Sequence, residues 1–251
     1  MNDVDIGTVR KRVEAYSNWY HRIELPHGVV TPGINDCQAY LPFLQPPSNC
    51  AGLRVLDLGT RDGYFAFEYE RRGATVIAVD YMARDRTGFG IAAELLNSNV
   101  EYVQANIYDL SVERFGTFDV VLFLGLLYHL PDPLGAIHRV RSVTQGAMFL
   151  ETHILDSALL MPDASFLRLQ DIDPVLAEVP LLQFYPGASL NRDDTNYFAP
   201  NLAALHGMLA ECNFQIIRRE MHGQRAIVEA RPISDPAREH LLRIAEGAEL
   251  P

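Results

Sequence analysis

Short apolar runs that alternate with helical segments dominate the chain from residue 52 onward. Five such runs, at 52–59, 74–80, 100–106, 118–125 and 146–152, enclose segments whose apolar residues recur at helical spacing. Strands that stay apolar along their length are typical of a parallel sheet covered on both faces. Two later runs, 214–221 and 225–231, predict an antiparallel edge hairpin. We therefore expect an α/β fold with a doubly wound, mostly parallel, seven-stranded sheet.

The same pattern divides the chain into four segments. Residues 1–50 hold a helix over about 4–20 and a Pro- and Gly-rich cap, and residues 51–153 hold the cofactor-binding core. Residues 154–200 break the rhythm with many Pro, Asp and Asn, which predicts a lid insertion. Residues 201–251 return to the core with a helix and the edge hairpin, and a charged tail helix follows.

Composition narrows the classes of function. The longest apolar run is about half of the roughly 20 residues that a membrane span needs, and residues 1–12 contain no apolar signal core. We expect a cytoplasmic protein without membrane association. The net charge is −11, and the chain contains a single lysine, Lys11. The negative charge would repel a polyanion and argues against a nucleic-acid partner. The three cysteines suggest neither a disulfide framework nor a zinc site, and homo-oligomerisation is left open.

The stretch LRVLDLGTRDGYF, residues 53–65, predicts a strand, a glycine turn and a helix. Gly59 and Gly63 would let the backbone approach a ligand closely. Asp80 follows Gly63 by 17 residues, ends the next strand and can accept hydrogen bonds from a ribose. The bulky Tyr64 and Phe65 do not suit a dinucleotide pyrophosphate. A cofactor with a ribose but no phosphate, such as S-adenosylmethionine, fits better.

Two stretches together, VLDLGTRDGYFAFEYERRGATVIAVD and FDVVLFLGLLYHLPDPL, resemble the class I S-adenosylmethionine-dependent methyltransferases. More narrowly, the chain is similar to the group of the tRNA wobble-uridine carboxymethyltransferases and related biosynthetic methyltransferases. The resemblance covers roughly residues 17–230 and includes WYHRIELPHGVVTPG, ETH and FYPGASLNRDDTNYFAPN. It implies the Rossmann-like methyltransferase fold.

The resemblance also implies a set of cofactor-binding residues. They would contact the methionine part, the ribose and the adenine of the cofactor, and Tyr128 would lie close to the sulfonium, where an aromatic ring suits a positive charge. Leu124 and Ile107 have an alternative role as core residues. The implied cofactor-binding residues are Asp57, Gly59, Gly63, Asp80, Tyr81, Met82, Asn106, Ile107 and Leu124.

Methyl transfer to a hydroxyl requires a base, and His129 is the best-placed candidate because it follows the fourth strand closely. Its ordinary pKa of about 6.5 suits proton removal near neutrality. Glu151 and His153, at the end of the fifth strand, could orient this base. Alternatively, these side chains could ligate a divalent metal such as Mg²⁺, or His129 could be structural and cap the following helix.

Acceptor-binding residues are expected in the cap, in the lid and on the edge hairpin. The candidates are His21, His153, Tyr185, Asn196, Tyr197 and Arg225. The wobble-uridine enzymes carry lysines before the first core strand that help bind a carboxylated cofactor, whereas this chain has no lysine after Lys11. We therefore expect plain S-adenosylmethionine to be the cofactor.

Three functions follow from these observations. The leading hypothesis is methyl transfer to a hydroxyl of a small molecule such as a sugar or secondary metabolite, with His129, Glu151 and Tyr128 as catalytic residues. The second is carboxymethyl or methyl transfer to a tRNA wobble uridine. The third is a protein that binds S-adenosylmethionine without catalysis, for which the altered loop residue Arg61 would be an indication.

Overall fold

The computed structural model describes residues 4–235 and residue 238. Its main sheet has seven strands in the order β12-β13-β7-β6-β3-β4-β5. β3, β4 and β5 pair in parallel, whereas β13 pairs antiparallel with both β7 and β12. The α/β class, the mostly parallel seven-stranded sheet and the antiparallel edge hairpin are therefore confirmed. None of the helices in the described residues has the length and apolar content that a membrane span requires.

The main strands are β3 (Arg54–Leu58), β4 (Thr75–Asp80), β5 (Glu101–Gln104), β6 (Phe118–Leu124), β7 (Thr144–His153), β12 (Phe214–His222) and β13 (Arg225–Pro232). Short strands form three separate hairpins: β1 (Glu24–Leu25) with β2 (Val29–Val30), β8 (Leu159–Leu160) with β9 (Phe166–Leu167), and β10 (Leu182–Phe184) with β11 (Phe198–Pro200).

The α-helices are α1 (Ile6–Glu14), α2 (Leu41–Leu44), α3 (Tyr64–Arg71), α4 (Phe89–Leu96), α5 (Val112–Phe115), α6 (Pro133–Val143), α7 (Leu169–Ile172) and α8 (Leu202–Glu211). The 3₁₀ helices are η1 (Pro26–Gly28), η2 (Cys37–Tyr40), η3 (Arg84–Arg86), η4 (Ile107–Asp109), η5 (Leu127–His129) and η6 (Pro174–Ala177).

The chain divides into two compact units. The first comprises Met1–Asp109 and Phe118–Leu122, and the second comprises Leu110–Thr117 and Phe123–Pro251. The units interleave in sequence, whereas the segment boundaries expected from the sequence are consecutive, so those boundaries stay a prediction. The expected tail helix lies outside the described residues.

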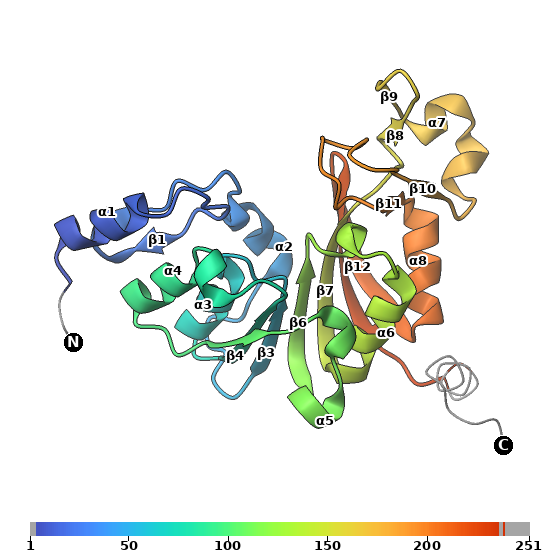
Figure 1. Ribbon diagram of the computed structural model, residues 1–251. Helices are drawn as coiled ribbons and strands as arrows, with labels where there is room; N and C mark the ends of the chain where they lie inside the picture. The colour runs from blue at the N-terminus through green and yellow to red at the C-terminus, as the bar shows by residue number, and fades with distance from the viewer. Residues whose placement is uncertain (1–3, 236–237, 239–251) are drawn as a thin grey trace. The chain divides into compact units, whose positions relative to one another are not determined.

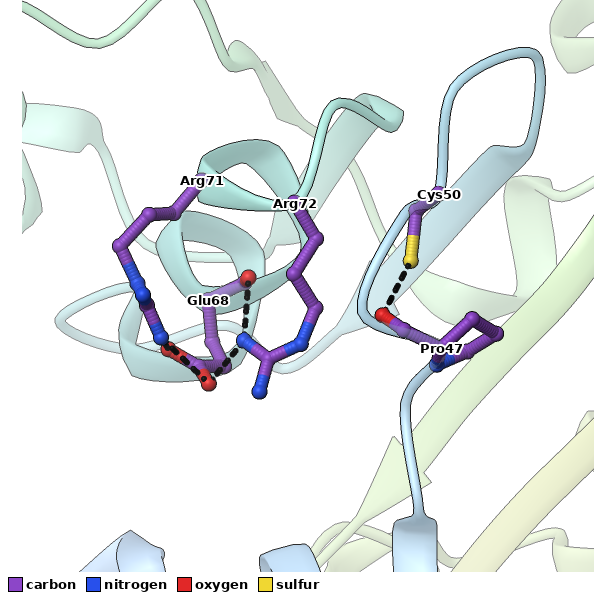
Figure 2. A network of polar contacts seen from close by, with 5 residues as sticks. All are labelled: Pro47, Cys50, Glu68, Arg71 and Arg72. Carbon is purple, nitrogen blue, oxygen red and sulfur yellow. Dashed lines mark hydrogen bonds and ion pairs between the residues drawn. The ribbon is translucent and has the colours of Figure 1, made fainter.

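In the first unit, β3 is buried from its second residue to its end, as its apolar sequence predicts. The following helix, α3, is anchored at its C-terminal end (Figure 2). Glu68 forms ion pairs with Arg71, at 2.8 Å, and with Arg72 one turn along the helix. The carbonyl of Arg72 accepts the N–H of Cys50 at 2.7 Å, and the Cys50 thiol donates to the carbonyl of Pro47 at 3.3 Å. The segment before β3 is thus attached to the end of the helix after β3.

The N-terminal helix is shorter than the predicted range of about 4–20. α1 ends at Glu14, and the chain then leaves the helix so that Trp19 can be buried. The indole Nε1 donates to the carbonyl of Val13 at 3.0 Å. Tertiary packing of this aromatic residue therefore overrides the helical spacing.

In the second unit, capping residues set where the helices begin. Asp132 accepts the N–H of Gly135 at the start of α6, and Asn201 accepts the N–H of Ala204 at the start of α8. The insertion expected at 154–200 contains β8, β9, α7, η6, β10 and β11. Figure 1 shows β8, β9 and α7 gathered beyond the carboxyl end of β7. Tyr185 and Leu190 are among the buried residues of a small apolar cluster in this insertion.

Candidate functional site

The loop after β3 has the backbone conformation that its glycines predict. Gly59, Arg61 and Gly63 have φ values of 67°, 52° and 92°. At Gly63 a Cβ atom would lie 2.6 Å from the ring of Phe67 and 2.7 Å from that of Phe89, so only glycine fits without a shift of its neighbours. Arg61 adopts the left-handed conformation without being glycine, which a non-glycine residue can do at a modest cost.

Asp80 joins the loop to the end of β4. Its carboxylate accepts the backbone N–H of Arg61 and that of Met82, each at 3.0 Å, and the residue is only 6% exposed. A carboxylate oxygen can accept more than one hydrogen bond, so this group is fixed in place and can still receive a hydroxyl. Beside it, the ring of Tyr81 is 70% exposed, as a side chain that stacks on a ligand would be.

Asp57, the last-but-one residue of β3, is directed into the loop. Its carboxylate accepts the hydroxyl of Thr60 at 2.7 Å and the backbone N–H of Ala66. Burial raises the pKa of Asp57 to about 7. The structure therefore shows Asp57 stabilising the loop, and its contact with the amino group of a cofactor stays a prediction.

The expected adenine-edge residues lie after β5. The side-chain oxygen of Asn106 accepts the N–H of Tyr108 at 3.1 Å, and the residue is exposed. Ile107 is 6% exposed and belongs to the core, as its alternative role predicted. The first unit thus places a fixed carboxylate, an exposed aromatic ring and a loop of left-handed backbone next to one another, and this set fits a cofactor with a ribose and a purine.

The second unit brings together the charged residues expected on β7 and β13. Arg225 pairs with His153 in the strand register, and its guanidinium lies 3.4 Å from the carboxylate of Glu151. The guanidinium also lies over the ring of Tyr128, 4.7 Å from its centroid. Burial raises the pKa of Glu151, and the charge of Arg225 opposes this effect. Gly125 has φ of 67°, a conformation that favours glycine, and its N–H donates to the backbone carbonyl of Glu151 at 3.0 Å.

His129 is held by Thr195, a residue of the insertion expected at 154–200. Its Nδ1 lies 3.1 Å from the carbonyl oxygen and 2.8 Å from the hydroxyl oxygen of Thr195. The Thr195 hydroxyl donates to Asp193 at 2.6 Å. A carbonyl oxygen can only accept, so the network assigns the proton of the neutral ring to Nδ1 and leaves Nε2 as the proton acceptor. Burial lowers the pKa of His129 below its ordinary value.

The group that orients the ring of His129 is not one of those expected, which were Glu151 and His153. Nδ1 of His129 is bonded to Thr195, whereas Glu151 is paired with Arg225. His129 also does not cap the next helix, because Asp132 fills that position. Leu124, at the end of β6, is half-buried.

The expected acceptor-binding residues lie around the same cluster, with one exception. The rings of His153 and Tyr185 are 6.1 Å apart, and both residues are almost fully buried. Among the described residues, His153 Nε2 and the Tyr185 hydroxyl have no hydrogen-bond partner. Tyr197 donates its N–H to the carbonyl of Tyr128 at 2.9 Å. Asn196 is buried, and its amide donates to the carbonyl of Leu190 at 3.2 Å.

His21 is the exception, because it belongs to the first unit. It is 6% exposed and packs between the rings of Tyr64 and Phe65. Burial lowers the pKa of His21. The backbone N–H of His21 and that of Tyr20 donate to the carboxylate of Asp62, a residue that sequence reasoning did not select.

Three residues of these networks were missed: Asp62, Asp193 and Thr195. The Asp-x-Thr spacing at 193–195 is a signal for a local turn, and the N–H of Thr195 does bond to the Asp193 side chain. That signal does not indicate that Thr195 bonds to His129. No group of three or more His, Cys, Asp or Glu side chains that could hold a metal ion occurs in the described residues, and the suggested Mg²⁺ stays a prediction.

The chain is similar to known proteins over much of its length. The family model described as a methyltransferase domain matches residues 33–218. A tRNA U34 carboxymethyltransferase from Dichelobacter nodosus is 27% identical over 70% of this chain, and a ubiquinone biosynthesis O-methyltransferase from Vibrio parahaemolyticus is 31% identical over 60% of it. The matches span 50% and 63% of the lengths of these two relatives.

The fold is also found among solved structures. The N-terminal domain of EvdMO1, determined in the presence of S-adenosylhomocysteine and D-fucose, superposes with a TM-score of 0.62 at 18% identity. The superposition covers 92% of this chain and 98% of that domain. The sequence match, the strand order and the loop after β3 agree, and the chain belongs to the family of class I S-adenosylmethionine-dependent methyltransferase domains.

Proposed function

We propose that this chain uses S-adenosylmethionine to methylate a hydroxyl group of a small molecule such as a sugar or secondary metabolite. The observation that carries this proposal is the hydrogen-bond network of His129. Thr195 and Asp193 hold its Nδ1, so that Nε2 is available as a base. An amine acceptor would need no such oriented base, whereas a hydroxyl does.

The state of His129 suits this role. Its lowered pKa keeps the ring neutral at physiological pH, so it can take up a proton. The Asp193 carboxylate favours the protonated ring that forms when the proton arrives, because its charge acts to raise the pKa of His129. Thr195 fixes the orientation, as the third group does in a catalytic triad.

The first unit would hold the cofactor. Asp80 would receive the ribose hydroxyls, Tyr81 would stack against the adenine, and the loop around Gly59 would approach the methionine part. When bound, S-adenosylmethionine supplies an activated methyl group for in-line displacement. The protein then needs mainly to align the acceptor and remove its proton.

The charges around His129 support a neutral acceptor. Glu151 already neutralises Arg225 at 3.4 Å, and Asp193 adds a further negative charge. His153 stays uncharged at neutral pH because burial lowers its pKa to about 4. The buried Tyr185 hydroxyl and His153 Nε2 offer uncharged hydrogen-bonding atoms beside this cluster, as the recognition of a sugar or polyol requires.

The test separates binding from chemistry. Wild-type protein should bind S-adenosylmethionine in calorimetry and release S-adenosylhomocysteine with a hydroxyl acceptor, for which catechol and D-fucose are suitable probes. His129→Ala should keep its cofactor affinity and lose at least about 100-fold in turnover. Thr195→Val should lower the turnover in part because it removes the hydroxyl bonded to His129, and Thr195→Ser, which keeps a hydroxyl, should have turnover close to that of the wild type. Full activity of His129→Ala with cofactor and acceptor saturating would show that His129 is not the base.

A second candidate is carboxymethyl transfer to a tRNA wobble uridine, and the similarity to the Dichelobacter nodosus enzyme favours considering it. It predicts tighter binding of carboxy-S-adenosylmethionine and tRNA binding that weakens steeply with salt. The pairing of Arg225 with Glu151 argues against it, since this cation is already compensated. Calorimetry with both cofactors decides: a tenfold preference for the carboxylated one, about 1.4 kcal/mol, would favour the tRNA function.

A further inference from the structure

Asp62, in the middle of the cofactor loop, is a fully buried carboxylate whose partners come from two other segments. Its Oδ2 accepts the backbone N–H of Tyr20 at 2.6 Å and that of His21 at 2.9 Å. Its Oδ1 accepts the N–H of Gly88 at 2.8 Å. The exposed fraction of Asp62 is 0%. One side chain thus connects the loop after β3, the segment after α1 and the start of α4.

The segment that Asp62 holds has its own internal structure, and we refer to residues 16–35 as the cap segment. The hydroxyl of Thr31 donates to the carbonyl of His21 at 2.6 Å and accepts the N–H of Ile23 at 2.8 Å. The N–H of Asn35 donates to the carbonyl of Tyr20 at 2.8 Å. These bonds make the cap segment a folded unit with its own internal hydrogen bonds.

Trp19 provides a second contact between the cap segment and α4. Its ring lies directly against Gly88, where a Cβ atom would come within 2.3 Å of it, and its exposed fraction is 5%. The Asp62 carboxylate and the Trp19 ring therefore meet at the same backbone position. Closure of the cap segment depends on both contacts.

The neighbours of Asp62 in sequence belong to the cofactor loop itself. The N–H of Arg61 bonds to the carboxylate of Asp80, and Gly63 is the left-handed residue at which α3 begins. If the cap segment opened, Asp62 would lose two of its three backbone donors while still buried. A buried carboxylate without partners is strongly unfavourable, so the loop would have to move to expose it.

We propose that Asp62 is a positioning residue that couples closure of the cap segment to the cofactor-binding conformation of the loop. The proposal rests on the proposed function, because the ligand is the S-adenosyl cofactor of that function. Binding of the cofactor to the loop then stabilises the closed cap segment, and opening of the cap segment lowers the affinity for the cofactor.

The experiment follows the cap segment and the cofactor separately. Arg22 is exposed in the cap segment and offers a cleavage site for trypsin. In the wild type, S-adenosylhomocysteine should slow cleavage after Arg22 and slow hydrogen exchange at the amides of Tyr20 and His21. Asp62→Asn should bind S-adenosylhomocysteine at least tenfold more weakly and should be cleaved after Arg22 at similar rates with and without it.

Two further variants separate coupling from general destabilisation. Asp119→Asn is the matched control, because Asp119 accepts a backbone N–H from Arg54 at 2.9 Å at the opposite end of the strands. It should leave both readouts unchanged. Gly88→Ala should displace the Trp19 ring without removing the carboxylate, and it should also weaken cofactor binding and accelerate cleavage after Arg22.

The outcomes are distinguishable. If the wild type binds S-adenosylhomocysteine and neither cleavage after Arg22 nor exchange at Tyr20 and His21 changes, the coupling is wrong while the proposed function stands. A folded Asp62→Asn protein with unchanged affinity would also overturn it. If Asp62→Asn does not fold, the wild-type exchange data and Gly88→Ala decide. If the wild type does not bind S-adenosylhomocysteine, the proposed function fails, and the coupling fails with it.

Discussion

The ion pair between Arg225 and Glu151 permits a prediction whose magnitude and pH dependence both follow from the structure. Glu151 is 3% exposed on β7, and the guanidinium that lies 3.4 Å away is its cationic partner. Arg225→Met would remove the positive charge and keep much of the side-chain volume. The carboxylate of Glu151 would then be buried without that charge.

Breaking a fully buried ion pair by removing one partner costs about 3–5 kcal/mol. The side chain of Arg225 is 36% exposed, so water screens part of its charge. We therefore expect Arg225→Met to lower the free energy of unfolding by about 2–3 kcal/mol at pH 8. Loss of the contact between the guanidinium and the ring of Tyr128 contributes to this value.

The pH dependence identifies the cause. Burial raises the pKa of Glu151 in the folded state, and without the opposing charge of Arg225 it would rise further. A carboxyl group with a raised pKa destabilises the fold only once the unfolded chain can ionise, above about pH 4.5, and the effect is complete above the folded pKa. The variant should therefore differ little from the wild type near pH 4.5 and most at pH 8.

Urea unfolding at both pH values, followed by circular dichroism, measures these differences. Glu151→Gln provides the second arm of a double-mutant cycle, and in its background Arg225→Met should cost less than about 1 kcal/mol. The reasoning is refuted if Arg225→Met is equally destabilising at pH 4.5 and pH 8. It is also refuted if the substitution costs as much in the Glu151→Gln background as in the wild type.

Three other predictions concern the packing and titration of buried groups. Gly63→Ala should lower the free energy of unfolding by at least about 2 kcal/mol, because of backbone strain and clashes with the neighbouring rings. Gly28→Ala is the control: φ is 69° and nothing lies within 4 Å of the added Cβ, so it should cost only about 1 kcal/mol of strain. Equal urea midpoints of the two variants would contradict this. Burial lowers the pKa of His153 to about 4, so the wild type should lose up to about 3 kcal/mol as the pH falls from about 6.5 to 4, and melting curves of His153→Phe should lack that loss. Burial raises the pKa of Asp57 to about 7, so the wild type loses stability as the pH rises from about 4 to 7. Asp57→Asn should therefore be more stable than the wild type at pH 8, by no more than about 4 kcal/mol. A melting temperature of Asp57→Asn below that of the wild type at pH 8 would refute the sign.

The sheet class could be predicted from the sequence because the individual strands and the turns between them carry local signals. Apolar strands such as 53–58 and 74–80 can be buried only in a sheet covered on both faces, and the glycine turn after the first strand marks the edge where ligands bind. The end of α1 could not be predicted in this way. It depends on the burial of Trp19 against Gly88, about 70 residues away, and no local spacing encodes that contact.

The residues of the candidate site also differ in whether a local signal marks them in the sequence. Asp80, Glu151 and His153 were found because each one lies at or within two residues of the carboxyl end of a strand. The partner of His129 Nδ1 was not found, because Thr195 lies 66 residues further along the chain and in a lid whose path the sequence does not reveal. Asp62 was missed for a different reason: the groups that bond to its carboxylate are the backbone N–H groups of Tyr20, His21 and Gly88, and every residue except proline has such a group.

The charge around His129 bears on which acceptors can be used. Burial lowers the pKa of both His129 and His153, so neither ring contributes a positive charge at pH 7. Glu151 compensates Arg225, and the hydroxyl of Thr195 lowers the pKa of Asp193 and keeps that carboxylate ionised. The side chains of Arg225, Glu151 and Asp193 together therefore carry a net negative charge at pH 7, where the His129 ring is neutral. If the proposed function is right, we expect a phosphorylated or carboxylated acceptor to be repelled there and an uncharged polyol or phenol to be preferred.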